Sequence, residues 1–168
     1  MLRELHSELG IPENYGLDGT RPLFEEATDL VDVGPNLVGR MQRLTPVTAS
    51  RWTDMQAAAA GDGVILIIVS GFRSIDYQAR LIRKKINAGQ SITDILQVNA
   101  APGHSEHHTG LAVDIATPGS RPLTEEFEDS EAFRWLGVNA SRFGFSMSYP
   151  RDNPWGIVYE PWHWAQKA

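Results

Sequence analysis

The sequence contains no cysteine, and this absence removes three kinds of chemistry at once. A thiolate zinc site, a cysteine nucleophile and a disulfide framework all need that side chain. Chains without cysteine occur in both reducing and oxidising compartments, so the redox environment of the protein stays open.

Long apolar runs and excess positive charge are also missing. No run approaches the roughly eighteen apolar residues that a membrane-spanning helix needs, so we expect no membrane span. The formal net charge of −6 and the lack of a basic face argue against nucleic acid as a partner. The first residues, Met1 to His6, carry an acidic side chain and lack a long apolar stretch, so no signal peptide is visible in this chain.

The sequence does have the length and composition of one globular domain. With 168 residues, 42% of them hydrophobic, it can bury a substantial core, and no internal repeat divides it. We expect residues 1–46, which glycine and proline interrupt, to form a loop-rich wrap, in which 24–30 is either helical or extended over the core. Residues 47–168 would then form the functional core, and His6 would lie at the surface.

The rest of the chain alternates helical and strand patterns. Helices are predicted from Thr48 to about Gly61, from Ser74 or Asp76 to Gly89, from Ser91 to Leu96 and from Ser130 to Gly144. Strands are predicted for 64–69, 111–115, 145–149 and 157–159. The last two strands are linked too tightly for a parallel crossover. The pattern therefore predicts an α+β domain with a mainly antiparallel sheet and helices packed on one face.

Two features of the second predicted helix and the strand before it concern charge. The strand ends at Ser70-Gly71, so Arg73 lies just after its carboxyl end. An arginine at that position is stronger evidence of a functional role than one on the face of a helix. The pair Lys84-Lys85, with Arg80 and Arg83, is interpreted as the solvated side of the helix.

The stretch from Pro102 to Ile115 concentrates the chemistry of the chain. Asp114 interrupts an apolar run that would be buried, and an ionised carboxylate there needs a hydrogen-bond donor, a cation or a metal. His104, His107 and His108 lie just upstream on a loop. Neutral imidazole and carboxylate are ligands that zinc accepts.

A second group of candidate residues lies in Glu160-Pro161-Trp162-His163-Trp164. Catalytic zinc usually takes three protein ligands and has a carboxylate nearby, and Asp114, one upstream histidine and His163 meet the first requirement, with Glu160 meeting the second. Pro161 argues against a helical His-Glu-x-x-His motif. Because residues three apart in a strand point to opposite faces, we expect a bend around Pro161.

Together these motifs resemble the signatures of the LAS metallopeptidases, the group named for lysostaphin, the D-Ala-D-Ala peptidases and sonic hedgehog. The matching residues are Ser105-x-His107-x-x-Gly110-x-Ala112-x-Asp114, then Glu160-x-x-His163, and before both Ser70-Gly71-Phe72-Arg73-Ser74 with Gln78. The residues of these motifs are most similar to those of the VanY-type D-alanyl-D-alanine carboxypeptidases, and the resemblance covers roughly residues 64–164.

The resemblance implies a role for each matched residue. His107, Asp114 and His163 would hold one zinc ion per chain, while His108 falls on a variable position of the motif. Glu160 would act as general base and then as general acid. Arg73 would lie near the scissile carbonyl or the carboxylate of the substrate.

The resemblance defines less closely the roles of two matched residues and of two histidines outside the motif. Ser105 and Gln78 would hydrogen-bond the substrate or support the loop. His104 and His108 are expected to support the site or simply to belong to the loop.

The implied function is removal of the C-terminal D-alanine from peptidoglycan stem peptides. Similar signatures serve L,D-carboxypeptidases, dipeptidases and lysin-like peptidoglycan endopeptidases, so these stay open. A non-catalytic zinc-binding module, as in the hedgehog relative, needs neither Glu160 nor Arg73, and a metal-free polar cluster is the third alternative. The resemblance implies a periplasmic or cell-wall-associated protein, and the missing signal peptide leaves the cytoplasm open. The oligomeric state has no signal in the sequence.

Overall fold

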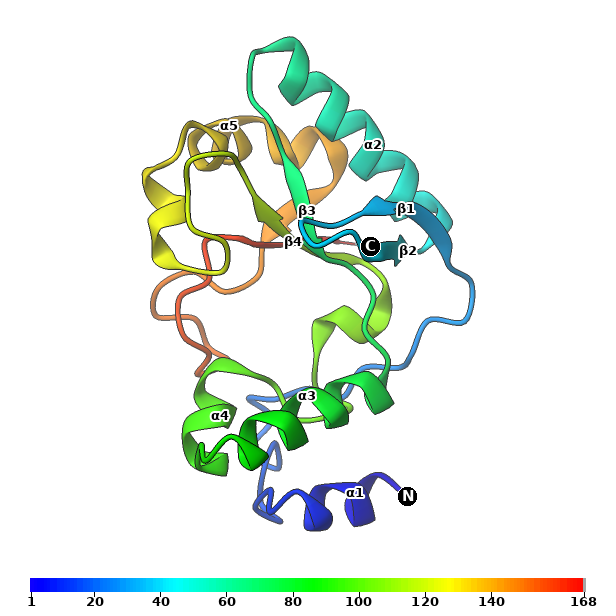
Figure 1. Cartoon of the computed structure of the whole chain (residues 1–168), viewed down its shortest axis with the longest axis vertical. Coiled ribbons are helices and arrows are strands. Elements are labelled where there is room, and N and C mark those ends of the chain that lie inside the picture. The colour runs from blue at the N-terminus through cyan, green and yellow to red at the C-terminus, as the bar shows by residue number, and fades with distance from the viewer. Residues whose placement is uncertain (168) are drawn as a thin grey trace.

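A four-stranded sheet lies at the centre of the structure, a computed structural model that describes residues 1–167 (Figure 1). The strand order is β3 (Ile67–Ser70), β4 (Ala112–Ala116), β6 (His163–Gln166) and β5 (Phe145–Met147), and every neighbouring pair is antiparallel. In this register, Asp114 of β4 pairs with His163 of β6 and with Ser70 of β3. The sheet thus brings together three motifs that are far apart in the sequence.

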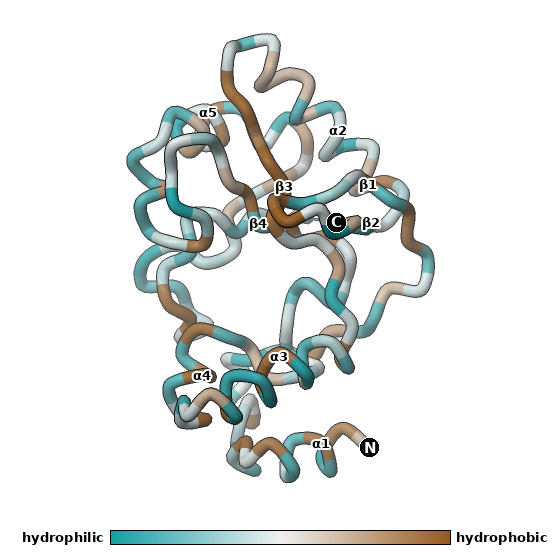
Figure 2. The backbone as a smooth tube through the Cα atoms, in the orientation of Figure 1, coloured by the Kyte–Doolittle hydropathy of each residue, from teal (hydrophilic) through white to brown (hydrophobic). Residues whose placement is uncertain are grey.

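One face of the sheet carries the main hydrophobic core. Helices α2 (Pro46–Gly61) and α5 (Glu131–Asn139) lie on this side, and Trp52 of α2 is fully buried against β-strand residues that include Val113 and Ile115. Figure 2 shows the apolar residues following β3 and β4 through the middle of this unit. The predicted α+β class with a mainly antiparallel sheet is confirmed, although helices pack on this face of the sheet and a second group of helices lies on the other side.

A second helical layer lies beyond the opposite face of the sheet. It consists of α3 (Ile75–Asn87), α4 (Ile92–Val98) and α1 (Leu2–Glu8), which are together at the other end of the view in Figure 1. Ile82 of α3 and Ile95 of α4 are fully buried and pack with Leu9, which follows α1. The helices predicted to begin near Ser74 and at Ser91 are confirmed as α3 and α4. None of the helices within residues 1–167 is long and apolar enough to cross a membrane.

The N-terminal part contains three elements that the sequence pattern did not predict. Besides α1, residues Val31–Pro35 (β1) and Met41–Leu44 (β2) form an antiparallel hairpin. The segment 24–30 contains no helix and runs in an extended path, where the amides of Phe24 and Ala27 donate to carbonyls of the histidine loop. The helical alternative for this segment is therefore wrong.

Other predictions also differ from the structure: the strand predicted at 64–69 begins only at Ile67, and the strand predicted at 145–149 ends at Met147. The helix expected up to Gly144 divides into α5 and a 3-10 turn, Ala140–Phe143. The strand expected at 157–159 is wrong, because the side chain of Asn153 hydrogen-bonds Trp155 and Ile157 and folds this segment into a loop. The last strand begins only at His163.

Candidate metal centre and catalytic groove

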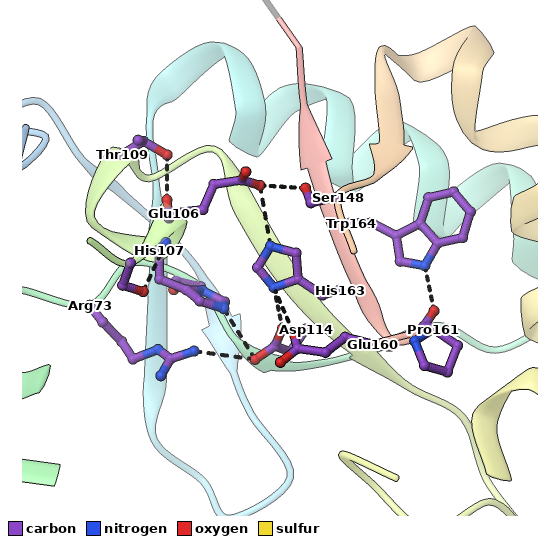
Figure 3. A network of polar contacts seen from close by, with 12 residues as sticks. Arg73, Glu106, His107, Thr109, Asp114, Ser148, Glu160, Pro161, His163 and Trp164 are labelled. Atoms are coloured by element: carbon purple, nitrogen blue, oxygen red, sulfur yellow. Dashed lines mark hydrogen bonds and ion pairs between the residues drawn. The ribbon is translucent and has the colours of Figure 1, made fainter. Parts of the chain in front are cut away.

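Two histidines and an aspartate meet on the face of the sheet that points away from the main core (Figure 3). His107, Asp114 and His163 are all buried, and each contributes a ligand atom within 4.8 Å of the other two. The Nε2 atom of His107 is 3.2 Å from Oδ2 of Asp114, and Nδ1 of His163 is 3.0 Å from Oδ1. These are nitrogen and oxygen donors of the kind that catalytic zinc sites use.

Local structure explains why these side chains converge. Val113 and Ile115 point into the core, so strand alternation turns Asp114 to the opposite face. His163 follows because it pairs with Asp114 across the ladder. His107 lies in a 3-10 turn, Glu106–Thr109, that ends at Gly110 in the left-handed conformation with φ of +67°.

The hydrogen bonds of His107 fit a metal ligand. Its Nδ1 atom donates to the carbonyl of Gly71 at 2.7 Å, which leaves the lone pair on Nε2. That Nε2 atom is buried and has no hydrogen-bond partner in the described residues, and burial lowers the pKa of the ring to about 4. A neutral imidazole with a buried, unpaired lone pair beside a carboxylate fits a divalent metal.

His163 has a carboxylate on each side of its ring. Nδ1 faces Asp114, while Nε2 lies 3.2 Å from Oε1 of Glu106, which also accepts a hydrogen bond from the Ser148 hydroxyl at 2.6 Å. Burial opposes the charge of both partners, yet these contacts raise the pKa of His163 to about 10 and lower the pKa of Glu106 to about 2. A metal at Nδ1 would therefore have to displace a proton.

Glu106 is a site residue that the sequence analysis missed. It occupies an unspecified position between Ser105 and His107 of the motif, so only its place on the same turn as a ligand could have identified it. It orients His163 in the way that carboxylates commonly orient metal-binding histidines.

Glu160 reaches the same cluster from a turn. The amide of His163 donates to the Glu160 carbonyl at 3.2 Å, and the amide of Glu160 donates to the Tyr149 carbonyl at 3.0 Å, so the bend predicted around Pro161 is confirmed. Oε2 of Glu160 lies 3.7 Å from Nδ1 of His163. Burial raises the pKa of Glu160 to about 7, which suits a group that both accepts and returns a proton.

Arg73 lies on the other side of Asp114. Its Nη2 atom is 3.4 Å from Oδ2 of Asp114, and Nη1 donates to Oε1 of Gln78 at 3.2 Å. Gln78 is in turn held by donating to the Ala100 carbonyl at 2.8 Å. The structure therefore brings Arg73 and Gln78 into the site, with Gln78 supporting the guanidinium group.

The remaining loop residues connect the motifs. The Ser105 hydroxyl accepts from the His107 amide at 3.3 Å. His108 bonds the Arg73 carbonyl through Nδ1 at 2.6 Å and accepts from the Gly103 amide through Nε2 at 3.0 Å. His104 bonds the Arg21 carbonyl through Nδ1 at 2.8 Å. Both unmatched histidines thus support the loop and lie outside the metal cluster.

The site opens into a cavity of about 540 Å³, lined by residues that include Arg73, Gln78, Ser105, Glu160 and His163. A neighbouring cavity of about 630 Å³ shares Arg73 and Asp114 with it. The two cavities therefore adjoin each other beside the cluster. Three possible metal ligands, a carboxylic acid and an arginine in one groove are the set of groups that metal-assisted hydrolysis uses.

Comparison with known families gives the same class. The VanY family, described as D-alanyl-D-alanine carboxypeptidase, matches residues 41–166, and the chain belongs to this family. It is 36% identical over 121 residues to a D-alanyl-D-alanine carboxypeptidase of Enterococcus faecalis, covering 66% of this chain and 43% of the relative. It is 30% identical over 170 residues to the putative carboxypeptidase YodJ of Bacillus subtilis, covering 97% of this chain and 58% of the relative. The chain thus spans about half the length of these relatives.

Solved structures share the fold. The LdcB LD-carboxypeptidase superposes with a TM-score of 0.74 at 32% identity, covering 86% of this chain and 71% of its own. VanYB in complex with D-alanine-D-alanine superposes with a TM-score of 0.66 at 29% identity, covering 87% of this chain and 82% of its own. A variant of the D,D-pentapeptidase VanY in complex with Zn(II) superposes with a TM-score of 0.64 at 30% identity, covering 83% of this chain and 79% of its own.

Proposed function

We propose that the protein is a zinc-dependent carboxypeptidase that removes the C-terminal D-alanine from peptidoglycan stem peptides. The observation that carries this proposal is the meeting of Glu160 and Arg73 with the cluster of His107, Asp114 and His163 in one groove. The zinc-bound VanY neighbour supports the metal, and the VanYB complex with D-alanine-D-alanine supports the substrate class. Such a substrate places its action at the cell wall.

One zinc ion would be held by Nε2 of His107, the carboxylate of Asp114 and Nδ1 of His163. When bound, it would supply a Lewis acid that polarises the scissile carbonyl and lowers the pKa of a water molecule. The protein contributes a rigid, buried donor set, because Gly71 fixes the tautomer of His107 and Glu106 that of His163.

Glu160 handles the protons of the reaction. With its pKa raised to about 7 by burial, its carboxylate can take a proton from the attacking water and its acid form can give that proton to the leaving amine. The guanidinium group of Arg73 can complement the negative charge that develops on the carbonyl oxygen. Ser105 and Gln78 are proposed to contact the substrate as well as to support the loop and the arginine.

The second candidate is L,D-carboxypeptidase activity, which would remove D-alanine from a tetrapeptide stem. The observation that favours it is the similarity to the LdcB LD-carboxypeptidase, at a TM-score of 0.74. Both reactions remove a C-terminal D-alanine, so the length of the stem peptide that the protein cleaves distinguishes them.

Digestion of a defined muropeptide mixture by the zinc-loaded protein tests both candidates. Wild type and Glu160→Ala are incubated with pentapeptide, tetrapeptide and cross-linked stems, and the products are identified by mass. Loss of one alanine from the pentapeptide by wild type alone would support the main proposal, and loss from the tetrapeptide would support the L,D class. Cleaved cross-links would indicate an endopeptidase. No product from any stem with zinc bound would refute the proposed substrate.

A further inference from the structure

One cation in the groove has no role in the chemistry described so far. Lys85 lies about two helical turns after Gln78 on α3, so both side chains are on nearly the same face of that helix. The lysine is half-buried and lines the 540 Å³ cavity together with Arg73, Gln78 and Glu160. Helix α3 lies across the site from the sheet (Figure 1).

The ammonium group of Lys85 has no acidic partner in residues 1–167. No ion pair in the described part of the chain includes Lys85, whereas Arg80 and Arg83 on the same helix pair with Asp76 and Glu8. Burial and the nearby charge of Arg73 lower the pKa of the Lys85 ammonium group. Two neighbouring cations at one cavity destabilise each other unless an anion lies between or beside them.

The other two cations that line the cavity each have a hydrogen-bond partner in the protein, whereas Lys85 has none in the described residues. Arg73 contacts Asp114 and Gln78. Arg21 donates to the Gly156 carbonyl at 3.0 Å. Lys85 therefore offers the free donors for an anionic ligand that enters the groove.

We propose that Lys85 anchors the free C-terminal carboxylate of the substrate, with Arg73 beside it. This inference rests on the proposed carboxypeptidase function and names the group that would restrict cleavage to chain ends. An ammonium group and a carboxylate form a charge-assisted hydrogen bond, and a substrate whose C-terminus is amidated or extended cannot form it. The anchor thus makes the reaction depend on a terminal carboxylate.

Adjacent lysines provide a matched pair of variants. Lys84 is exposed and outside the cavity, so Lys84→Met controls for the loss of one positive charge on α3. Each variant and wild type are tested on the stem peptide that wild type cleaves, with a free carboxylate and as its C-terminal amide. In Lys85→Met we expect KM for the free acid to rise roughly tenfold to a hundredfold with little change in kcat. Hydrolysis of the amide should be unaffected, and Lys85→Arg should restore most of the preference.

A binding experiment keeps this inference separate from the proposed function. Zinc-loaded Glu160→Ala protein, with and without Lys85→Met, is titrated calorimetrically with D-alanyl-D-alanine and with its amide. Tighter binding of the free acid that is lost with Lys85→Met supports the anchor. Equal behaviour of Lys85→Met and Lys84→Met, or equal losses for acid and amide, would overturn it. Absence of hydrolysis by wild type, by contrast, bears on the proposed function alone.

Discussion

Replacing Glu106 by glutamine should weaken zinc binding without removing a ligand. The carboxylate accepts from His163 Nε2 at 3.2 Å and from the Ser148 hydroxyl at 2.6 Å, and Lys167 Nζ lies 3.8 Å away. Glutamine keeps the length of the side chain and one acceptor oxygen, which can still face His163 and Ser148 because both contact Oε1, but it loses the negative charge. The imidazole of His163 would then be a less basic ligand and would be held less firmly in the required tautomer.

The expected effect is a rise of about tenfold to a hundredfold in the zinc dissociation constant, or about 1.4 to 2.7 kcal/mol. Competition with a chromophoric chelator at constant pH measures this directly. Ser148→Ala serves as the comparison, because it removes one hydrogen bond from Glu106 while the contact with His163 remains, so its loss of affinity should be clearly smaller. Circular dichroism of both variants verifies that the fold is retained.

Two results would refute this reasoning. Unchanged zinc affinity in Glu106→Gln would mean that the carboxylate does not tune His163. A loss of equal size in Ser148→Ala would mean that the local packing of the loop, rather than the charge of Glu106, supports the ligand.

Four further outcomes are expected. Glu160→Gln should lower turnover by at least about a hundredfold while zinc content, measured by metal analysis, stays at the wild-type level. His163→Ala should lose both zinc and turnover, and a zinc-loaded, active His163→Ala protein would contradict its place in the cluster. Because the pKa of His163 is raised to about 10, zinc binding near neutral pH should release about one proton, seen as a calorimetric enthalpy that depends on the ionisation enthalpy of the buffer. Gly110→Ala should lower the midpoint of thermal unfolding more than Gly119→Ala, because both residues have positive φ but a Cβ at Gly110 would lie 3.0 Å from Leu30 and nothing lies within 4 Å at Gly119.

The site could be located from the sequence because its residues break local patterns. Asp114 stands out in a run of apolar residues, and alternation then fixes the face of the sheet on which it lies. The pairing of Asp114 with His163 could not be derived from either segment alone, since it depends on the neighbouring positions of β4 and β6. The spacing of the family signatures supplied that information indirectly.

The missed elements have weak local signals. Strand β1 contains Gly34 and Pro35, which normally indicate a turn, and it forms a hairpin because tertiary contacts support it. One such contact is the hydrogen bond from the Phe72 amide to the Arg43 carbonyl of β2, at 2.9 Å. The apolar residues at 157–159 carry a strand signal, but the turn built by Asn153 overrides it.

Lys85 shows why a charged helix face cannot be interpreted from the sequence alone. Adjacent residues of a helix point about 100° apart, so Lys84 can lie in solvent while Lys85 turns toward the groove. The sequence predicts the apolar stripe of α3, but it does not predict that Arg73 and Lys85 line one cavity. Only the fold places Lys85 in the same cavity as Arg73, where the lysine has no ion-pair partner in the described residues, and this is why the proposed carboxylate anchor has no signal in the sequence.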